Sequence, residues 1–183
     1  RIKEPGYHWT FPEPISEVIR IPVKEVRSLP IQSFWYFETD QERLAGGKKF
    51  ASDGLNPTRD GYCLTRNEPL TELKGSDYNI VHSQWTVTYS ISSPVRFFEN
   101  FYMESRKPGE SFMEVAARTV NPVIESFTSD AIVTTLVRYS IDDAVRSRTG
   151  ISDRVRAMLQ AKLDAVESGI QVDDVRINHI TWP

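Results

Sequence analysis

The stretch from residue 79 to residue 92 reads NIVHSQWTVTYSIS, and large apolar side chains alternate with polar ones along it. The apolar side chains fall on odd-numbered positions: Val81, Trp85, Val87, Tyr89 and Ile91. The even-numbered positions are polar: His82, Gln84, Thr86, Thr88 and Ser90. Because successive side chains of a strand point to opposite faces, this period of two predicts a long antiparallel strand. We expect its odd face to be core and Gln84, Thr86 and Thr88 to be more exposed.

A shorter alternating run precedes this strand. Tyr62 and Leu64 belong to it, and the turn-forming residues Gly75, Ser76 and Asp77 lie between it and the long strand. Two extended runs on either side of such turn chemistry are typical of a β-hairpin. We therefore expect the two runs to pair.

Other extended segments lie nearer the N-terminus. Residues 16–24 alternate, but Pro22 cannot donate to a ladder, so this segment is expected as an edge strand. Residues 29–37 are rich in β-forming side chains, which favours a further strand. Residues 38–60 are polar, carry Gly46-Gly47 and lack periodicity, which predicts a long loop.

Helical patterns follow the long strand. Ser93 and Pro94 suit the cap and first residue of a short helix, which we expect to bury Val95, Phe98 and Phe101. Ser111 and Glu114 then form a capping-box pattern ahead of a helical apolar stripe. The stripe consists of Phe112, Val115, Ala116, Val120, Val123, Ile124 and Phe127.

Pro122 is expected to kink or divide that helix, and residues 128–139 to add a helical piece near Phe127. Ser140 and Asp143 repeat the capping pattern. A last helix is expected from about residue 153 to Gly169, burying one stripe of apolar side chains. That stripe consists of Val155, Met158, Leu159, Leu163 and Val166.

The last strand is expected over residues 170–180. A bulge is expected at Asp173-Asp174, because the apolar side chains change there from even to odd positions. Together these elements predict an α+β fold in which an antiparallel sheet packs one face against helices. The chain is expected to be one domain over residues 1–183, with a mainly β part (1–92) and a mainly helical part (93–183).

Composition excludes several classes of function. The chain has 183 residues and a formal net charge of −3, so no overall basic field favours a nucleic-acid partner. Cys63 is the single cysteine, which excludes an internal disulfide and a cysteine-based zinc cluster. No run approaches the roughly 20 apolar residues that span a bilayer.

Candidate catalytic groups are sparse. His8, His82 and His179 lie far apart without metal-ligand spacing, which favours polar strand positions over a metal site. Cys63 lacks a nucleophile motif around it and is expected to be a small buried thiol. Asp142-Asp143 suits the first turn of a helix. No catalytic, cofactor-binding or metal-ligating residue is therefore assigned.

The N-terminal segment is the candidate contact site, either with a partner or with the membrane surface. Its rings and prolines suit a protein contact or a membrane interface, and the alternative is packing against the sheet. The candidate residues are Tyr7, Trp9, Phe11, Pro12, Pro14 and Ile15.

Four blocks of the chain together resemble the SPFH or band 7 (prohibitin homology) domains, the bacterial HflK and HflC branch most of all. The blocks are EPGYHWTFPEPI (4–15), SDYNIV leading into WTVTYSI (76–91), SP with FFEN (93–100), and the last helix with GIQVDDVRI (154–177). The longer segment at 38–60 and the piece at 128–139 depart from the family pattern.

This resemblance implies a non-catalytic, membrane-associated scaffold that forms homo- or hetero-oligomers with related SPFH subunits, without a cofactor. It also implies a single-pass anchor in a bacterial inner membrane, a coiled coil outside this stretch, a periplasmic domain, and association with a membrane AAA protease of the FtsH type. Two other classes stay open: a hydrolase using Cys63 or a carboxylate pair, and a soluble ligand-binding module. A histidine within hydrogen-bond reach of Cys63 would favour the hydrolase.

Overall fold

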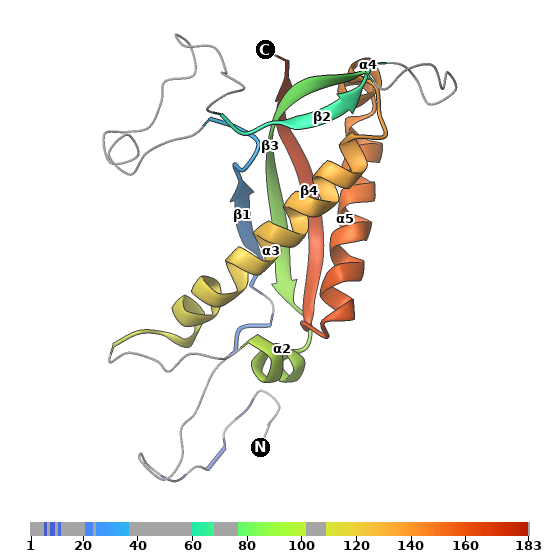
Figure 1. Ribbon diagram of the computed structural model, residues 1–183. Coiled ribbons are helices and arrows are strands. Elements are labelled where there is room, and N and C mark those ends of the chain that lie inside the picture. Colours follow the sequence, from blue (N-terminus) through green and yellow to red (C-terminus); the bar gives the residue numbers. More distant parts are fainter. Residues whose placement is uncertain are drawn as a thin grey trace.

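Figure 1 shows the computed structural model, which describes residues 6, 8–9, 11, 21–23, 25–36, 60–67, 77–101 and 109–182. The strands of this part of the chain are β1 (Arg27–Ile31), β2 (Cys63–Arg66), β3 (Tyr78–Ile91) and β4 (Ile170–Thr181). The helices are α2 (Pro94–Phe101), α3 (Phe112–Leu136), α4 (Ile141–Arg146) and α5 (Arg148–Ala165).

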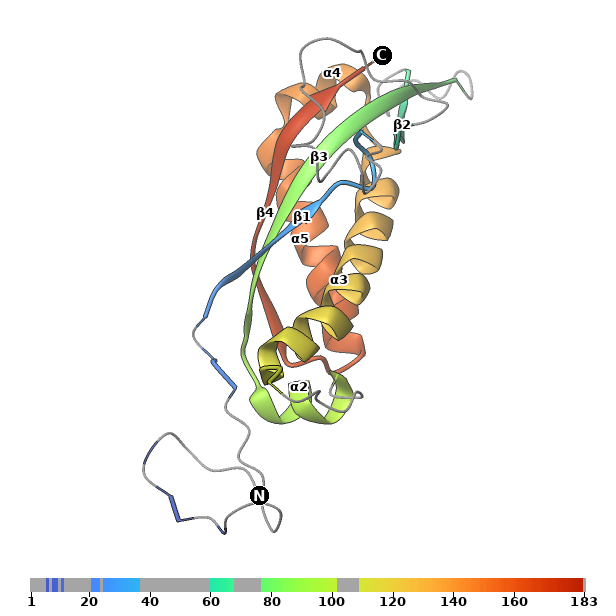
Figure 2. The ribbon, with the colours of Figure 1, turned by 90° about the vertical axis from the view of Figure 1, so that its left-hand side faces the viewer.

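The long strand β3 is the centre of an antiparallel sheet. β4 pairs along one side of β3, while β1 and β2 pair with successive parts of its other side. Helices α3 and α5 lie together on one face of this sheet (Figure 2). The predicted α+β architecture, with an antiparallel sheet covered by helices on one face, is therefore confirmed.

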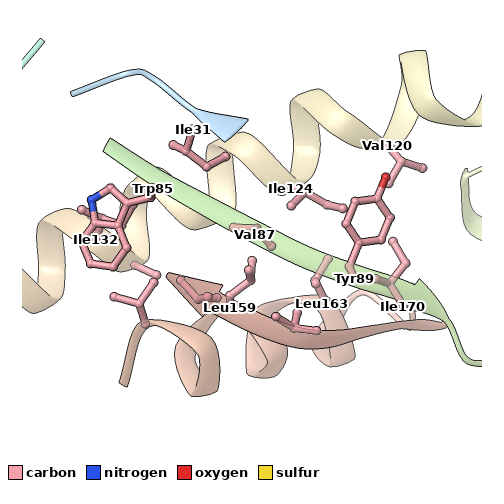
Figure 3. Packing of buried hydrophobic residues seen from close by; sticks show 14 of the residues in the cluster. Ile31, Trp85, Val87, Tyr89, Val120, Ile124, Ile132, Leu159, Leu163 and Ile170 are labelled. Atoms are coloured by element: carbon pink, nitrogen blue, oxygen red, sulfur yellow. The ribbon is translucent and has the colours of Figure 1, made fainter. Parts of the chain in front are cut away.

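The predicted odd face of β3 is the core face. Trp85 and Val87 are fully buried, and Tyr89 and Ile91 are nearly so, whereas Gln84, Thr86 and Thr88 are half-exposed. Figure 3 shows Trp85, Val87 and Tyr89 on the side of β3 that faces the helices. The side chains they meet there are Val120, Ile124 and Ile132 of α3 and Leu159 and Leu163 of α5. Each fully buried aliphatic side chain contributes about 1.5–3 kcal/mol, so this contact holds the two layers together.

The hairpin and the bulge are also confirmed. Cys63 of β2 lies opposite Val81 of β3, in antiparallel register. In β4 the register skips Asp173 between the partners of Thr88 and Tyr89, as the parity change predicted. A second irregularity lies between the partners of Gln84 and Trp85.

Helix α3 begins with the predicted capping box. The Ser111 side chain accepts a hydrogen bond from the Glu114 backbone N–H, and the Glu114 side chain accepts one from the Ser111 N–H. The expected division at Pro122 is wrong, because α3 runs unbroken from residue 112 to residue 136. Pro122 faces solvent, so water can hydrate the carbonyl that loses its helical donor. Residues 128–136 are helical, as expected, and they continue α3.

The burial of the short helix α2 differs from the expectation. Phe97 and Phe101 are buried with their rings stacked at 6.0 Å, whereas Phe98 is 37% exposed and Val95 is half-buried. Phe97 and Phe101 are four residues apart and therefore lie one above the other on the helix. Sequence spacing alone did not distinguish this stripe from one through Phe98.

The last helix begins five residues earlier than expected, at Arg148 instead of residue 153. Ser147 ends α4 and also stands at the start of α5, where its side chain makes no capping hydrogen bond, so no capping signal marks the start. Val155, Leu159 and Leu163 are buried as expected, but Val166 is exposed because it lies at the C-cap.

The N-terminal expectations are only partly within the described residues. Residues 21–23 are not in a strand, so the edge strand expected at 16–24 is wrong for them. The remainder of that segment, the loop at 38–59 and the Gly75-Ser76 turn lie outside the described residues. The β-rich run at 29–37 contributes the end of β1, which begins earlier, at Arg27.

Candidate functional site

Cys63 lies at the start of β2 and is almost completely buried. Burial raises the pKa of its thiol to about 12, although a hydrogen bond with Ser83 acts in the opposite direction. A nucleophilic cysteine needs the thiolate form near neutral pH. This environment therefore favours a structural thiol.

The register also separates Cys63 from the nearest histidine in the sheet. Cys63 lies opposite Val81, so these two side chains share one face of the hairpin. His82 follows Val81 in β3 and points to the other face. The Cys–His pair that would have favoured a hydrolase is therefore not formed between these residues.

His82 is the largest difference between the expected polar face of β3 and the structure. Its side chain is fully buried, and its Nδ1 lies 2.6 Å from the carbonyl oxygen of Gly61. Because a carbonyl only accepts, Nδ1 carries the proton and donates. The imidazole therefore fastens the segment before β2 to β3.

Several chain segments meet around this histidine. The N–H of Gly61 donates to the Trp35 carbonyl at 2.9 Å, and the N–H of Ser83 donates to the Phe34 carbonyl at 2.9 Å. The indole of Trp85 donates to Ser83 Oγ at 2.9 Å. This set of backbone and side-chain bonds is a structural junction, which we call the Gly61 junction.

The other candidate titratable residues have structural partners. His179 stacks on Trp35, with ring centroids 5.8 Å apart. At the start of α4, the N–H of Asp143 donates to Ser140 Oγ and the Asp143 carboxylate accepts from the Ser140 hydroxyl, which is the predicted cap. Asp173 accepts from Ser90 Oγ at 3.2 Å, and Asp174 pairs with Arg176. Within the described ranges, no group of three or more His, Cys, Asp or Glu side chains is placed to hold a metal ion.

Of the six candidate contact residues, the structure describes Trp9 and Phe11. Trp9 is 98% exposed and Phe11 is 70% exposed. Tyr7, Pro12, Pro14 and Ile15 lie outside the described residues. The structure thus shows that these two aromatic side chains are largely at the surface.

The sequence did not reveal a second set of exposed large hydrophobic side chains, which lies on the hairpin. Tyr62, Leu64 and Tyr78 are each more than one third exposed, whereas Cys63 and Thr65 between them are buried. The alternation of β2 is therefore present, but its apolar side faces outward. Alternation gives the period of a strand and not which face is covered.

Among the described helices, none is both long and apolar enough to cross a lipid bilayer. A family model described as SPFH domain / Band 7 family matches residues 1–183. No curated protein matches the chain significantly.

Proposed function

The chain belongs to the SPFH domain / Band 7 family, whose members are generally membrane-associated scaffolds, and we propose that it assembles laterally into large oligomers at a membrane. The observation that carries this proposal is the family match over residues 1–183, supported by the absence of a catalytic arrangement at Cys63 and His82 in the described structure. The buried His82 side chain instead joins Gly61 to β3.

The finer assignment within the family follows from the N-terminal motif. We assign the chain to the HflK and HflC branch, with a single-pass anchor in a bacterial inner membrane and this domain on the periplasmic side. Its partners are then related SPFH subunits and a membrane AAA protease of the FtsH type. The quoted blocks at 4–15 and 76–91 support this assignment.

The proposed contact surface is the segment from Tyr7 to Ile15. Trp9 and Phe11 are exposed, and aromatic side chains often provide much of the binding energy at protein interfaces. Pro12 and Pro14 restrict the backbone and so reduce the ordering entropy of docking. Each contact is expected to be weak, because many linked copies supply the strength of an assembly through effective concentration.

The deciding measurement is sedimentation of the whole encoded protein, extracted in mild detergent. We expect a large oligomer that shifts toward smaller species when Trp9 and Phe11 are both replaced by alanine. Trp182→Ala is the matched control, because Trp182 is also an exposed tryptophan, 58% accessible, but follows β4 at the other end of the chain. A persistent monomer of the unchanged protein would remove the scaffold proposal.

Association with the protease is tested separately. The unchanged protein and the Trp9→Ala, Phe11→Ala variant are each mixed in detergent with a purified FtsH-type protease, and co-migration is measured. We expect binding by the oligomeric form. If the oligomer forms but does not co-migrate with the protease, the scaffold proposal stands and the protease partner is rejected.

A further inference from the structure

β4 is an edge strand within the described part of the sheet. It pairs with β3 along one side, and no other described strand pairs with it. The exposed N–H and C=O groups of an edge strand can pair with a strand of another molecule, which leads to uncontrolled sheet extension. We therefore asked which groups of the protein cover the outer side of β4 and so hinder pairing with a strand of another molecule.

The register shows which backbone groups of β4 face outward. Gln171 lies opposite Ser90 of β3. The carbonyl of Ile170 and the N–H of Val172, on either side of Gln171, point outward, because both bond to Gln160 of α5. After the irregularity at Asp173, the same alternation places the groups of Val175 and Ile177 outward. The outer edge thus has a first part at 170–172 and a second part at 175–177.

The side chain of Gln160 in α5 covers the first part. Its Oε1 accepts a hydrogen bond from the N–H of Val172 at 2.7 Å. Its Nε2 donates to the carbonyl oxygen of Ile170 at 3.1 Å. The amide therefore satisfies an outward donor and an outward acceptor of β4, as the backbone of a neighbouring strand would.

Other side chains hold the Gln160 amide in this position. Gln160 Nε2 donates to Asp164 Oδ1 at 2.7 Å, one turn further along α5. Gln171 Nε2 donates to Gln160 Oε1 at 3.3 Å. Because α5 packs on the sheet through Leu159 and Leu163, the amide is also carried on a fixed backbone. An incoming strand would have to break this network before it paired here.

The remaining edges carry different obstacles. The second part of the β4 edge is short, since register irregularities lie on both sides of it. It also carries charge, from the exposed Arg176 within it and the half-exposed Asp174 just before it. On the other side of the sheet, β1 contains Pro30 opposite Thr86 and so lacks one N–H. Bulges, charges and proline at edges are known means of preventing edge-to-edge pairing.

We propose that Gln160 is an edge-sealing residue that prevents copies of this domain from joining their sheets through β4. Its loss would uncover the outward groups at Ile170 and Val172. The inference concerns the dispersed domain and does not rest on the scaffold proposal.

The first test compares Gln160→Met with Ala157→Met. Methionine keeps the length of the glutamine side chain but removes both edge bonds, whereas Ala157 is an exposed position of the same helix. We expect Gln160→Met to raise the exchange rate of the Val172 amide hydrogen by about tenfold or more. We also expect concentration-dependent association with added β-structure, measured by sedimentation and thioflavin fluorescence.

The Ala157→Met control should retain the parent exchange rate and remain dispersed. Unchanged Val172 exchange in folded Gln160→Met, or association no greater than that of Ala157→Met, would overturn the proposal. Should Gln160→Met fail to fold, the unchanged protein decides. Its Val172 amide should exchange about tenfold or more slowly than the amide of Ile177, the outward position of the second part that is partly exposed. Equal exchange rates of the two amides would show that Gln160 does not protect the Val172 N–H and would contradict the proposal.

Discussion

The two ends of the antiparallel pair β3–β4 are joined to the rest of the fold by different contacts. Where β4 begins, the carbonyl of Gly169 accepts hydrogen bonds from the N–H groups of Ser92 and Ser93 at 2.9 and 3.0 Å. Where β4 ends, the Gly61 junction joins the segment before β2 to its neighbours, because Gly61 bonds to the Trp35 carbonyl and to the His82 side chain. The first end joins α2 to the sheet, and the second joins the segment around Trp35 to β2 and β3.

The difference between the two ends shows where the alternation of apolar and polar residues in β3 predicts which side chains are buried. At the Gly169 end, β3 keeps its regular alternation up to Ile91, because only one face is covered. At the Gly61 end, Val81, His82 and Ser83 are all buried, because separate chain segments cover both faces. A period of two therefore reports a half-covered strand and disappears where both faces are covered.

The largest predicted effect is at the Gly61 junction. A Cβ at residue 61 would lie 1.9 Å from the Ser33 carbonyl oxygen, so the backbone must move. That movement would also disturb the bonds to Trp35 and His82. We expect Gly61→Ala to lower the free energy of unfolding by about 3–4 kcal/mol, measured by urea denaturation.

Gly150→Ala is the control for this change. A Cβ at Gly150, in α5, would have no atom within 4 Å other than those of its chain neighbours and of the adjacent helix backbone. Because alanine is the better helix former, the expected change is a stabilisation of up to about 1 kcal/mol. Equal effects of Gly61→Ala and Gly150→Ala would show that close approach at Gly61 is unimportant.

The corresponding change at the other end is expected to be smaller. Gly169 has a φ of +69°, and a Cβ there would lie 2.4 Å from the Ser93 carbonyl oxygen. The left-handed backbone costs about 1–2 kcal/mol, and the overlap adds to it, so Gly169→Ala should destabilise by about 2–3 kcal/mol. Faster exchange of the Ser92 and Ser93 amides would locate the damage at the connection between β3 and α2, and unchanged exchange would contradict this.

The dependence of stability on alkaline pH tests whether Cys63, near the Gly61 junction, is shielded from water. Burial raises the pKa of Cys63 from 9.0 to about 12, so above pH 9 the unfolded chain releases the thiol proton while the folded chain keeps it. Stability should then fall between about pH 9 and 12, by at most about 1.4 kcal/mol per pH unit.

Cys63→Ser should reduce that fall, measured by urea denaturation at pH 8 and pH 10. Tyr89, whose pKa burial also raises, contributes in the same direction above pH 10 and stays in both proteins. Identical pH dependence with and without the thiol would show that Cys63 is accessible to water.

The smallest effect is a stabilisation near Gly169. Glu167 has a φ of +49°, which is uncommon for a residue with a side chain, and it lies just after α5. Asn100 Nδ2 donates to its carbonyl oxygen at 2.9 Å, and this bond does not need the glutamate side chain. Glu167→Gly should therefore raise the free energy of unfolding by about 0.5–1 kcal/mol. A loss of stability would mean that the side chain itself contributes.

The features predicted from the sequence are those set by nearby residues. The core face of β3, the hairpin with β2 and the caps at Ser111 and Ser140 depend on residues within one element or its neighbour. The bulge at Asp173 belongs to the same class, because parity along one strand reveals it. Local geometry is encoded by local spacing.

The features that were missed depend on distant segments. The burial of His82 requires Gly61, Phe34 and Trp35 to arrive from elsewhere in the chain. The role of Gln160 requires α5 to lie beside the edge of β4, and no spacing in the sequence indicates this. For the candidate contact segment, the structure adds the exposure of Trp9 and Phe11, and its role stays a prediction.

The most direct test of the whole account compares amide exchange in the dispersed domain with exchange in the assembled protein. If copies assemble through the N-terminal segment while the sheet edges stay unused, Val175 and Ile177 should exchange at the same rate in both states. Residues 7–11 should exchange more slowly on assembly. Slowed exchange at Val175 and Ile177, with residues 7–11 unchanged, would show that the copies join through β4 and would contradict the account.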